Sequence, residues 1–421
     1  MKILIYGSGG REHAIAYQLN KSKRVEKLWC APGNGGIAEV AECFPNVKAT
    51  DLDAAVKLAK ELNPDMIVVA PDDPLIMGLT DLLEAEGFKV FGPRKNAAII
   101  EGSKEFSKKL MQKYNIPTAK YKSFTDYKEA VDYINSQPVP IVVKADGPAL
   151  GKGVTVAETR EEAIDAVKAS MEDKIFGASG SCVVIEECLT GPEVSVLAFT
   201  DGKTMVPMVS SKDHKRAYDN DKGPNTGGMG TISPNPFYND ELAKECMETI
   251  FLPTMKAMNE EGRTFKGVLY FGLMITPNGP KVIEYNCRFG DPETQVVLPR
   301  LKTDLVDIFE AVINENLADI NIEWSDDACA CVIMASGGYP KSYEKGYEIS
   351  GLDNLCDCCV VYHAGTALKD GKIVTAGGRV LGVTCKGKTL DEALSRCYAN
   401  VNKISFEKGF YRTDIGKTGC K

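Results

Sequence analysis

Several features that would settle the class of this protein at once are missing from its sequence. No apolar stretch approaches the roughly 20 residues that cross a bilayer, so we expect no membrane span. Histidine is scarce, with 3 residues, and the 14 cysteines do not form the pair of C-x₂-C motifs typical of zinc sites. Lysine and arginine (50) are outnumbered by acids (58), giving a net charge of −8. No overall positive field is therefore available to hold nucleic acid.

What is present indicates an ordinary globular protein. The 421 residues are 44% hydrophobic and 26% charged, enough for about three domains of roughly 150 residues each. We expect the cysteines to be buried, reduced thiols that act as small hydrophobes, which fits a reducing cytoplasm. Cys329 and Cys331 stand two apart in an apolar run, so they should share one face of a strand. The first seven residues are too short for a signal sequence and are typical of a strand. We therefore expect a cytoplasmic protein.

The first part of the chain alternates short apolar runs with helical patterns. Strands are expected at residues 2–6, 28–31, 66–70 and 89–91, and helices at residues 11–20, 52–62 and 75–86. This βαβα order predicts a doubly wound parallel sheet over residues 1–102. Ligands of such sheets bind at the carboxyl ends of the strands.

The rest of the chain predicts two further domains. A helix should begin after Ser103, and residues 139–145 and 182–187 should be strands of a lid of about residues 120–190. Antiparallel hairpins with turns at residues 201–202 and 278–279, and a helix near residues 240–261, complete a domain over residues 103–327. Residues 328–421 should form a small β-rich domain closed by a helix at residues 390–404. The expected class is thus α/β combined with α+β.

A glycine-rich turn, GSGGRE, follows the first expected strand and opens a helix at residues 7–12. The G-x-G-x-x-G dinucleotide fingerprint would need a third glycine where Glu12 stands. Free amides at the helix N-terminus, with Arg11 beside them, suit a phosphate. An ordinary tight turn between strand and helix explains the same residues equally well.

A second glycine-rich loop, residues 147–153, follows a strand that ends near Lys144. Glycines let a backbone approach phosphates, and Lys144 and Lys152 would neutralise them. The loop is not a Walker A sequence, because Gly153 replaces the Ser or Thr after the lysine. The competing interpretation is a flexible surface loop. Pro148 stiffens this loop.

The most informative segment is KVIEYNCRFGDPE at residues 281–293. Glu284 and Asn286 stand two apart on an expected strand, so both present oxygens, which Mg²⁺ prefers, on one face. If the strand continues, Arg288 shares that face and could stabilise charge in phosphoryl transfer. A solvated sheet face is the alternative. Glu186 and Glu187, at the end of another strand, could meet an adenosine or simply be solvated.

Taken together, these segments resemble the ATP-grasp superfamily and, within it, the phosphoribosylamine–glycine ligase family. The resemblance runs from Met1 to near Gly416 and rests on GGREH (9–13), APGN (31–34), FGP (91–93), EGSK (101–104), KADG (144–147), DHKR (213–216), GPNTGGMG (223–230) and NCRFGDPET (286–294). It implies ATP-dependent ligation of glycine to 5-phosphoribosylamine through a glycyl phosphate. The products would be glycinamide ribonucleotide, ADP and phosphate, a step of de novo purine synthesis.

The resemblance also implies roles for individual residues and partners. Arg288 and Lys144 would be catalytic, and Glu284 and Asn286 would bind Mg²⁺ or Mn²⁺. ATP would be bound by Lys104, Lys144, Gly151, Gly153, Glu186, Glu187, Cys188, Leu189, Glu193, Arg216 and Asn225. The substrates would be bound by Gly9, Gly10, Arg11, Asn34, Asp213 and Arg288. No side-chain nucleophile is needed, and we expect a monomer, with a dimer as the alternative.

One departure from the resemblance concerns the metal. Many ATP-grasp enzymes carry a metal-binding carboxylate on the strand before Glu284, but residues 272–275 here are apolar. The metal would then have fewer protein ligands and more water or phosphate.

Three other functions compete with this one. They are an ATP-grasp ligase for a different acid, a nicotinamide-dependent oxidoreductase, and a nucleotide-binding regulator without catalysis. Glu12 at the third glycine position counts against the oxidoreductase.

Overall fold

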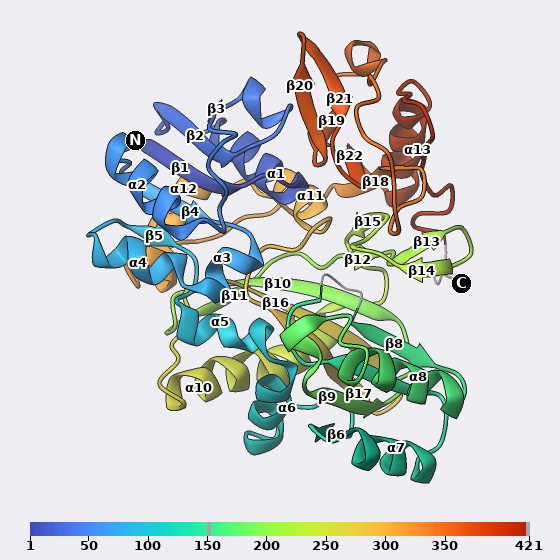
Figure 1. Ribbon diagram of the computed structural model, residues 1–421. Helices are drawn as coiled ribbons and strands as arrows, with labels where there is room; N and C mark the ends of the chain where they lie inside the picture. Colours follow the sequence, from blue (N-terminus) through green and yellow to red (C-terminus); the bar gives the residue numbers. More distant parts are fainter. Residues whose placement is uncertain (150–152, 418–421) are drawn as a thin grey trace.

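A computed structural model describes residues 1–149 and 153–417 of the chain. Its N-terminal, central and C-terminal parts surround a common centre, with the N-terminal sheet at the upper left and the C-terminal strands at the upper right of Figure 1. The central part lies below both in that view. None of the described helices is long and apolar enough to cross a bilayer.

The N-terminal part is the doubly wound parallel sheet that the sequence predicts. The strand order is β3-β2-β1-β4-β5, and every pair is parallel. The strands are β1 (Lys2–Gly7), β2 (Lys27–Pro32), β3 (Glu42–Cys43), β4 (Met66–Val69) and β5 (Val90–Phe91). The helices are α1 (Gly10–Leu19), α2 (Leu52–Leu62), α3 (Asp72–Met77), α4 (Leu79–Ala85) and α5 (Lys95–Gly102).

Two details of this sheet correct the sequence analysis. The short edge strand β3 was not expected, because two residues carry too little periodicity to be recognised. The single helix expected over residues 75–86 is two helices, α3 and α4, which meet at Gly78. Gly78 has a φ of +101°, a left-handed conformation that a helix interior does not accommodate but that glycine adopts freely.

Residues 104–187 form a helix and a four-stranded antiparallel sheet. Ser103 caps α6 (Lys104–Lys113) by accepting a hydrogen bond from the Phe106 amide. The sheet has the order β6-β9-β7-β8, built from β6 (Tyr121–Phe124), β7 (Ile141–Ala145), β8 (Val154–Ala157) and β9 (Val183–Glu187). Helices α7 (Tyr127–Ser136) and α8 (Arg160–Met171) contact each other and pack on this sheet around a core of their own.

A second antiparallel sheet, in the order β11-β10-β16-β17, provides the floor of the central part. Its strands are β10 (Glu193–Thr200), β11 (Met205–Pro207), β16 (Gly267–Thr276) and β17 (Gly279–Asn286). The predicted turns at residues 201–202 and 278–279 join β10 to β11 and β16 to β17. The helix predicted near residues 240–261 is α9 (Asp240–Cys246) and α10 (Leu252–Glu260), with a π-helical turn, Met247–Phe251, between them. Helices α11 (Thr294–Val297) and α12 (Leu305–Ile313) follow β17.

The C-terminal part is β-rich, as expected, but its sheet draws strands from the central part. The order β12-β15-β18-β22-β19 places β12 (Lys212–Asp213) and β15 (Gly230–Ser233) beside β18 (Ala328–Ser336). The remaining strands are β19 (Cys359–His363), β22 (Arg379–Gly387) and β23 (Gly409–Phe410), with hairpins β13 (Arg216–Tyr218)–β14 (Lys222–Asn225) and β20 (Thr366–Lys369)–β21 (Lys372–Thr375) alongside. Helix α13 (Leu390–Val401) packs on β18 and β22.

The cysteines follow the predicted pattern in most places. Cys329 and Cys331 pack in one core cluster, whereas Ala330 and Val332, which alternate with them on β18, pack in another. The shared strand face is therefore confirmed. The expectation that all the described thiols are reduced and buried is wrong, because Cys356 and Cys358 form a disulfide. A turn after Cys356 brings their Cα atoms to 5.2 Å.

Candidate active site

A cavity of about 1030 Å³ lies where the three parts of the chain meet. Strand ends and loops from all three parts line it, which is the usual position of a site in such architectures. Most of the residues proposed from the sequence line this one cavity: Arg11, Lys104, Lys144, Gly153, Glu186, Glu187, Cys188, Leu189, Glu193, Asp213, Arg216, Asn225, Glu284, Asn286 and Arg288.

Three of the proposed residues, Gly9, Gly10 and Asn34, do not line the cavity. A fourth, Gly151, lies outside the described residues. Gly9 and Gly10 stand behind the wall, where a Cβ on Gly10 would meet Gln295 Nε2 at 2.5 Å. The amide of Asn34 donates to the carbonyls of Ser8 and His363, both at 2.8 Å, and its oxygen accepts from two backbone amides. These three residues therefore shape the loops around the site.

Lysines occupy the end of the cavity between α6 and the β6-β9-β7-β8 sheet. Lys144 Nζ lies 3.0 Å from Glu186 Oε1 and donates to the Ile283 carbonyl at 3.0 Å. Lys108 Nζ lies 3.0 Å from Glu186 Oε2, and burial lowers its pKa to about 8 although Glu186 opposes the shift. Lys104 Nζ donates to the Gly147 carbonyl at 3.1 Å, and burial likewise lowers its pKa. One carboxylate thus serves two of three clustered cations, which leaves positive charge for an anionic ligand.

Strand β17 carries the proposed metal ligands. The pairing of β16 with β17 slips between Gly272 and Leu273, so β17 carries a bulge just before Glu284. Glu284 Oε1 lies 3.3 Å from Lys215 Nζ, and the charge of Lys215 lowers the pKa of Glu284 to about 2. The same attraction raises the pKa of Lys215 well above its usual value. Glu284 is therefore held as a carboxylate.

The strand ends at Asn286, so the condition under which Arg288 would share its face, a continuing strand, is not met. Arg288 nevertheless reaches the cavity because Glu101, at the end of α5, holds the turn that follows. Glu101 accepts hydrogen bonds from Asn286 Nδ2 (3.1 Å) and the Cys287 amide (2.7 Å), and it lies 3.0 Å from Arg288 Nη2. Since the Asn286 nitrogen is engaged, its oxygen is the atom left for a metal.

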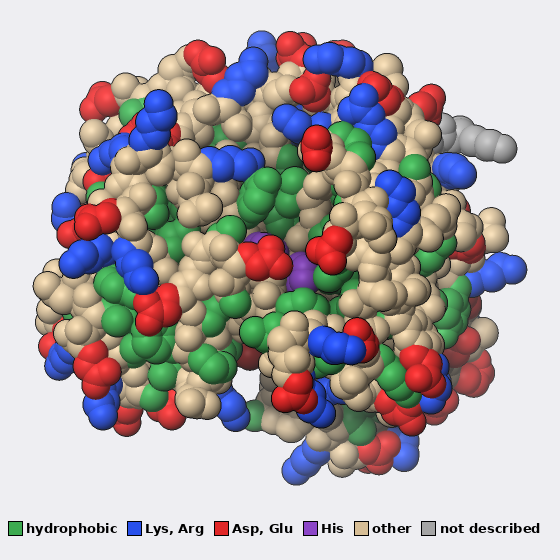
Figure 2. Space-filling view, turned by 90° about the horizontal axis from the view of Figure 1, so that it is seen from above, with side chains coloured by type: hydrophobic (Ala, Val, Ile, Leu, Met, Phe, Trp, Pro, Cys, Tyr) green, Lys and Arg blue, Asp and Glu red, His purple; other side chains and the backbone are tan. Residues whose placement is uncertain are grey.

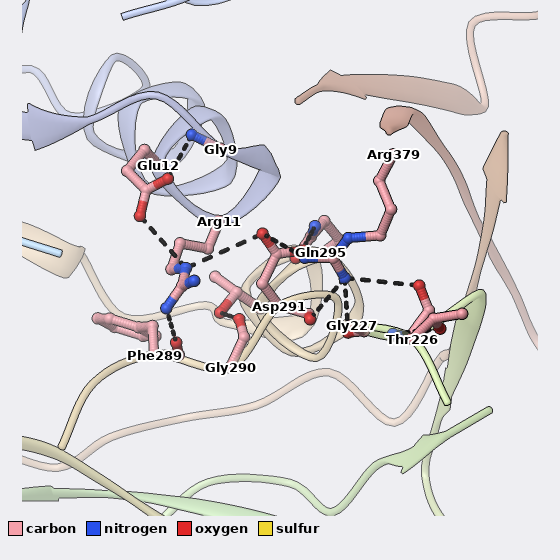
Figure 3. A network of polar contacts seen from close by, with 12 residues as sticks. Gly9, Arg11, Glu12, Thr226, Gly227, Phe289, Gly290, Asp291, Gln295 and Arg379 are labelled. Atoms are coloured by element: carbon pink, nitrogen blue, oxygen red, sulfur yellow. Dashed lines mark hydrogen bonds and ion pairs between the residues drawn. The ribbon is translucent and has the colours of Figure 1, made fainter. Parts of the chain in front are cut away.

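Arg11 lies at the opposite end of the cavity, within a network of charged side chains (Figure 3). Its Nη1 donates to the Phe289 carbonyl at 3.1 Å, and its Nε lies 3.3 Å from Glu12 and 3.9 Å from Asp291. Glu12 also accepts from the Gly9 amide at 2.5 Å, so a carboxylate already meets the start of α1. A phosphate at this end would therefore meet the guanidinium of Arg11 rather than that first amide.

A pair of acids completes the wall between the two ends. Burial raises the pKa of Asp213 well above its usual value, and the neighbouring charge of Glu293 adds to this shift. Glu293 accepts from Ser195 Oγ at 3.2 Å and is 4% exposed. His214, next to Asp213, is buried, and its ring nitrogens contact the Gly230 carbonyl and the Gly416 amide. His214 thus has a structural role.

The structure brings to the cavity several charged residues for which the sequence analysis proposed no role: Glu101, Lys108, Lys215, Asp291, Glu293 and Arg379. All but two of them lie inside the motifs that carry the resemblance, so their position within a motif could have marked them as site residues. Lys108 and Arg379 lie outside those motifs. Across residues 1–149 and 153–417, no group of three or more His, Cys, Asp or Glu is placed to hold a metal ion.

Comparison with known families covers nearly the whole chain. Residues 1–101 match the N domain of phosphoribosylglycinamide synthetase, residues 102–294 match its ATP-grasp (A) domain, and residues 329–418 match its C domain.

Full-length relatives agree with these matches. The chain is 48% identical over 415 residues to the phosphoribosylamine–glycine ligase of Caldanaerobacter subterraneus subsp. tengcongensis, covering 99% of both chains. It is 50% identical over 416 residues to that of Halalkalibacterium halodurans, covering 99% of this chain and 96% of the relative.

Solved structures show the same fold. The crystal structure of phosphoribosylamine–glycine ligase from Thermotoga maritima matches with a TM-score of 0.86 and 33% identity, over 98% of this chain and 100% of that one. The biotin carboxylase domain of 2-oxoglutarate carboxylase from Hydrogenobacter thermophilus, solved with MgADP and bicarbonate, matches with a TM-score of 0.74. It shares 15% identity over 97% of this chain and 91% of that one, a likeness of fold alone.

Proposed function

The chain belongs to the phosphoribosylamine–glycine ligase family, and from this premise we propose that the cavity described above joins glycine to 5-phosphoribosylamine. The chain is an ATP-using ligase of purine biosynthesis, like its relatives. The observation that carries the assignment to this cavity is its composition. Buried lysines stand at one end, Glu284, Asn286 and Arg288 at the centre, and Arg11 at the other end, with Asp213 in the wall between the two ends.

ATP occupies the end between α6 and the β6-β9-β7-β8 sheet. Lys104 and Lys144 neutralise its phosphates, because the buried Lys144 and the half-buried Lys104 both present ammonium groups at this end. Residues 186–189 present a strand end to the adenine, and Glu193 lies at the ribose. Arg216, Asn225, Gly151 and Gly153 complete the nucleotide contacts.

The donor set of β17 fits a divalent cation. The Glu284 carboxylate is ionised and the Asn286 amide oxygen is free, and such oxygens are the ligands that Mg²⁺ or Mn²⁺ prefers. Glu284 and Asn286 would hold the cation, which would supply positive charge to neutralise the ATP phosphates. Residues 272–275 offer no carboxylate, so few protein ligands would hold it.

The reaction proceeds in two displacements. The glycine carboxylate attacks the γ-phosphorus, the bond to ADP breaks, and glycyl phosphate forms. The amine of phosphoribosylamine then attacks the acyl carbon, phosphate leaves, and the amine loses a proton. Arg288 stabilises the negative charge at the centre, and Arg11 and Asp213 position the phosphoribosylamine, with Gly9, Gly10 and Asn34 shaping the loops behind. The protein acts by positioning and charge neutralisation.

The test is the release of ADP from ATP, Mg²⁺ and glycine, with and without freshly made phosphoribosylamine. We expect ADP only when both co-substrates are present, in step with glycinamide ribonucleotide detected by mass. Folded protein that binds ATP but releases no ADP would contradict the proposal and favour a non-catalytic regulator. Turnover with another acid in place of glycine would favour a different ligase, and a change in NADH fluorescence would favour the oxidoreductase.

Two further parts of the proposal concern the state of the protein. We place it in the cytoplasm as a monomer. Sedimentation at working concentration tests the monomer, and fractionation of cells tests the location.

A further inference from the structure

Arg379, the first residue of β22, reaches from the C-terminal sheet into the cavity, although no sequence motif indicated it. Its Nη1 donates to the carbonyls of Gly227 (2.6 Å) and Asp291 (2.8 Å), and its Nη2 lies 3.3 Å from Asp291 Oδ2. The side chain is 18% exposed. Figure 3 shows the guanidinium between the Gly227 turn and the Asp291 turn, on the far side of Asp291 from Arg11.

One branch of these contacts leads to Arg11. Asp291 stands between the two guanidinium groups, with Gln295 Nε2 donating to its other oxygen at 2.8 Å. Burial raises the pKa of Asp291, but the charges of Arg379 and Arg11 outweigh burial and bring the pKa below its usual value. Asp291 is therefore an anion that orients both arginines.

The other branch leads to Asp213. A Cβ on Gly228 would lie 2.5 Å from Asp213 Oδ1, so the turn that Arg379 holds is in direct contact with that carboxylate. Tyr339, also from the C-terminal part, accepts a hydrogen bond from the Gly227 amide at 3.0 Å. Two side chains of the C-terminal part thus hold Gly227, one bonded to its carbonyl and the other to its amide.

We propose that Arg379 is a positioning residue for the phosphoribosylamine half of the reaction. A single guanidinium connects the two residues assigned to that substrate, Arg11 through Asp291 and Asp213 through the Gly227–Gly228 turn. The inference rests on the proposed function, because it takes the Arg11 end of the cavity as the phosphoribosylamine site. Arginine suits this task because its planar fork reaches several acceptors in fixed directions, which a lysine ammonium does less well.

The ATP end does not depend on these contacts. Lys144 is held by Glu186 and the Ile283 carbonyl, and Lys104 by the Gly147 carbonyl. Arg288 is held by Glu101. Loss of the Arg379 side chain should therefore weaken the binding of phosphoribosylamine selectively, without weakening that of ATP.

The experiment compares steady-state kinetics of the full-length wild type with Arg379→Gln and Arg379→Lys, varying each substrate in turn. We expect Arg379→Gln to raise the KM for phosphoribosylamine by about tenfold or more and to lower kcat, with the KM for ATP and for glycine within about twofold. Arg379→Lys should recover part of the loss. Added guanidinium ion should partly restore Arg379→Gly.

Arg300→Gln is the matched control. Arg300 is 6% exposed and donates to Ser233 Oγ and the Ser325 carbonyl, and it does not line the cavity. This variant should change stability without a selective rise in the KM for phosphoribosylamine.

Three results would overturn the inference: an unchanged KM for phosphoribosylamine, an equal rise in all three KM values, or the same selective rise in Arg300→Gln. If Arg379→Gln does not fold, the same criteria apply to Arg379→Lys. A wild type that releases no ADP with glycine and phosphoribosylamine contradicts the proposed function itself, and so differs from a failure of this inference.

Discussion

Glu101 offers the sharpest test of how the site is built, because it touches no proposed substrate atom yet holds two residues that would. Its carboxylate accepts hydrogen bonds from the Asn286 side chain and the Cys287 amide, and it forms an ion pair with Arg288. Asn286 is the proposed metal ligand and Arg288 the proposed catalytic cation. We predict that Glu101→Gln lowers kcat/KM about a hundredfold while the protein remains folded.

The magnitude follows from the three contacts. Glutamine keeps one acceptor oxygen and puts an NH₂ group in place of the other. If that NH₂ group faces the Cys287 amide, a buried donor is left unsatisfied, at about 1–3 kcal/mol. In either orientation the side chain is neutral, so Arg288, a mostly buried cation, loses its counter-ion, at about 3–5 kcal/mol. A loss of about 3 kcal/mol in the transition state corresponds to roughly 150-fold in rate.

The assay is ADP release with all three substrates, together with a thermal unfolding curve for each variant. Glu105→Gln is the control, since Glu105 lies in the neighbouring helix and pairs with Lys109 at the surface. It should retain activity within about twofold. Activity of Glu101→Gln within threefold of wild type, in a folded protein, would refute the argument that Glu101 positions the turn.

Other perturbations test the remaining parts of the site. Glu284→Ala and Arg288→Ala should each abolish turnover without changing the far-UV circular dichroism, and near-native activity in either would remove that residue from the mechanism. Because the pKa of Glu284 is lowered, its ionised form stabilises the folded protein fully above pH 4.5, and this stabilisation is lost as the pH falls toward about 2. Lys215→Met should flatten this acid dependence of the urea midpoint, and an unaltered dependence would contradict the pairing. Gly228→Ala should lower both the melting temperature and activity, because φ is +112° and the new Cβ would lie 2.5 Å from a carboxylate oxygen. Gly87→Ala, with φ +87° and open space, isolates the cost of backbone strain, and equal effects would exclude a clash at Gly228.

The sequence pattern predicted helices and strands well where residues close together in the sequence determine the structure. Helix α2 runs over residues 52–62 as its apolar stripe indicates, with Asp51 capping it by accepting from the Ala54 amide. Periodicity could not show that Gly78 splits a helix, since a glycine within a helical stripe is tolerated in many helices. It also could not show that β17 ends at Asn286, because the end depends on Glu101, 185 residues away.

The charged network of the site illustrates the same limit. The sequence pattern indicates that Arg11 and Asp213 are near glycine-rich turns, but not which distant charges meet them. Arg379 contacts Gly227 from 152 residues away and Asp291 from 88, so its role depends on tertiary packing alone. The family resemblance located the motifs, while the partners that orient their side chains came from the structure.

The sheet that continues from β18 into β15 has a consequence for engineering this chain. Gly230–Ser233 pairs with β18 on one side and β12 on the other, so its backbone groups are satisfied by strands from two parts of the chain. A protein that ends before Ala328 would lack β18, so the buried strand β15 would become an unpaired edge strand. Unpaired edge strands pair with strands of other molecules. Chimeras that exchange C-terminal segments between relatives should therefore keep the β15–β18 register. Without it, we expect β15 of one chimera to pair with a strand of another molecule rather than with its own β18.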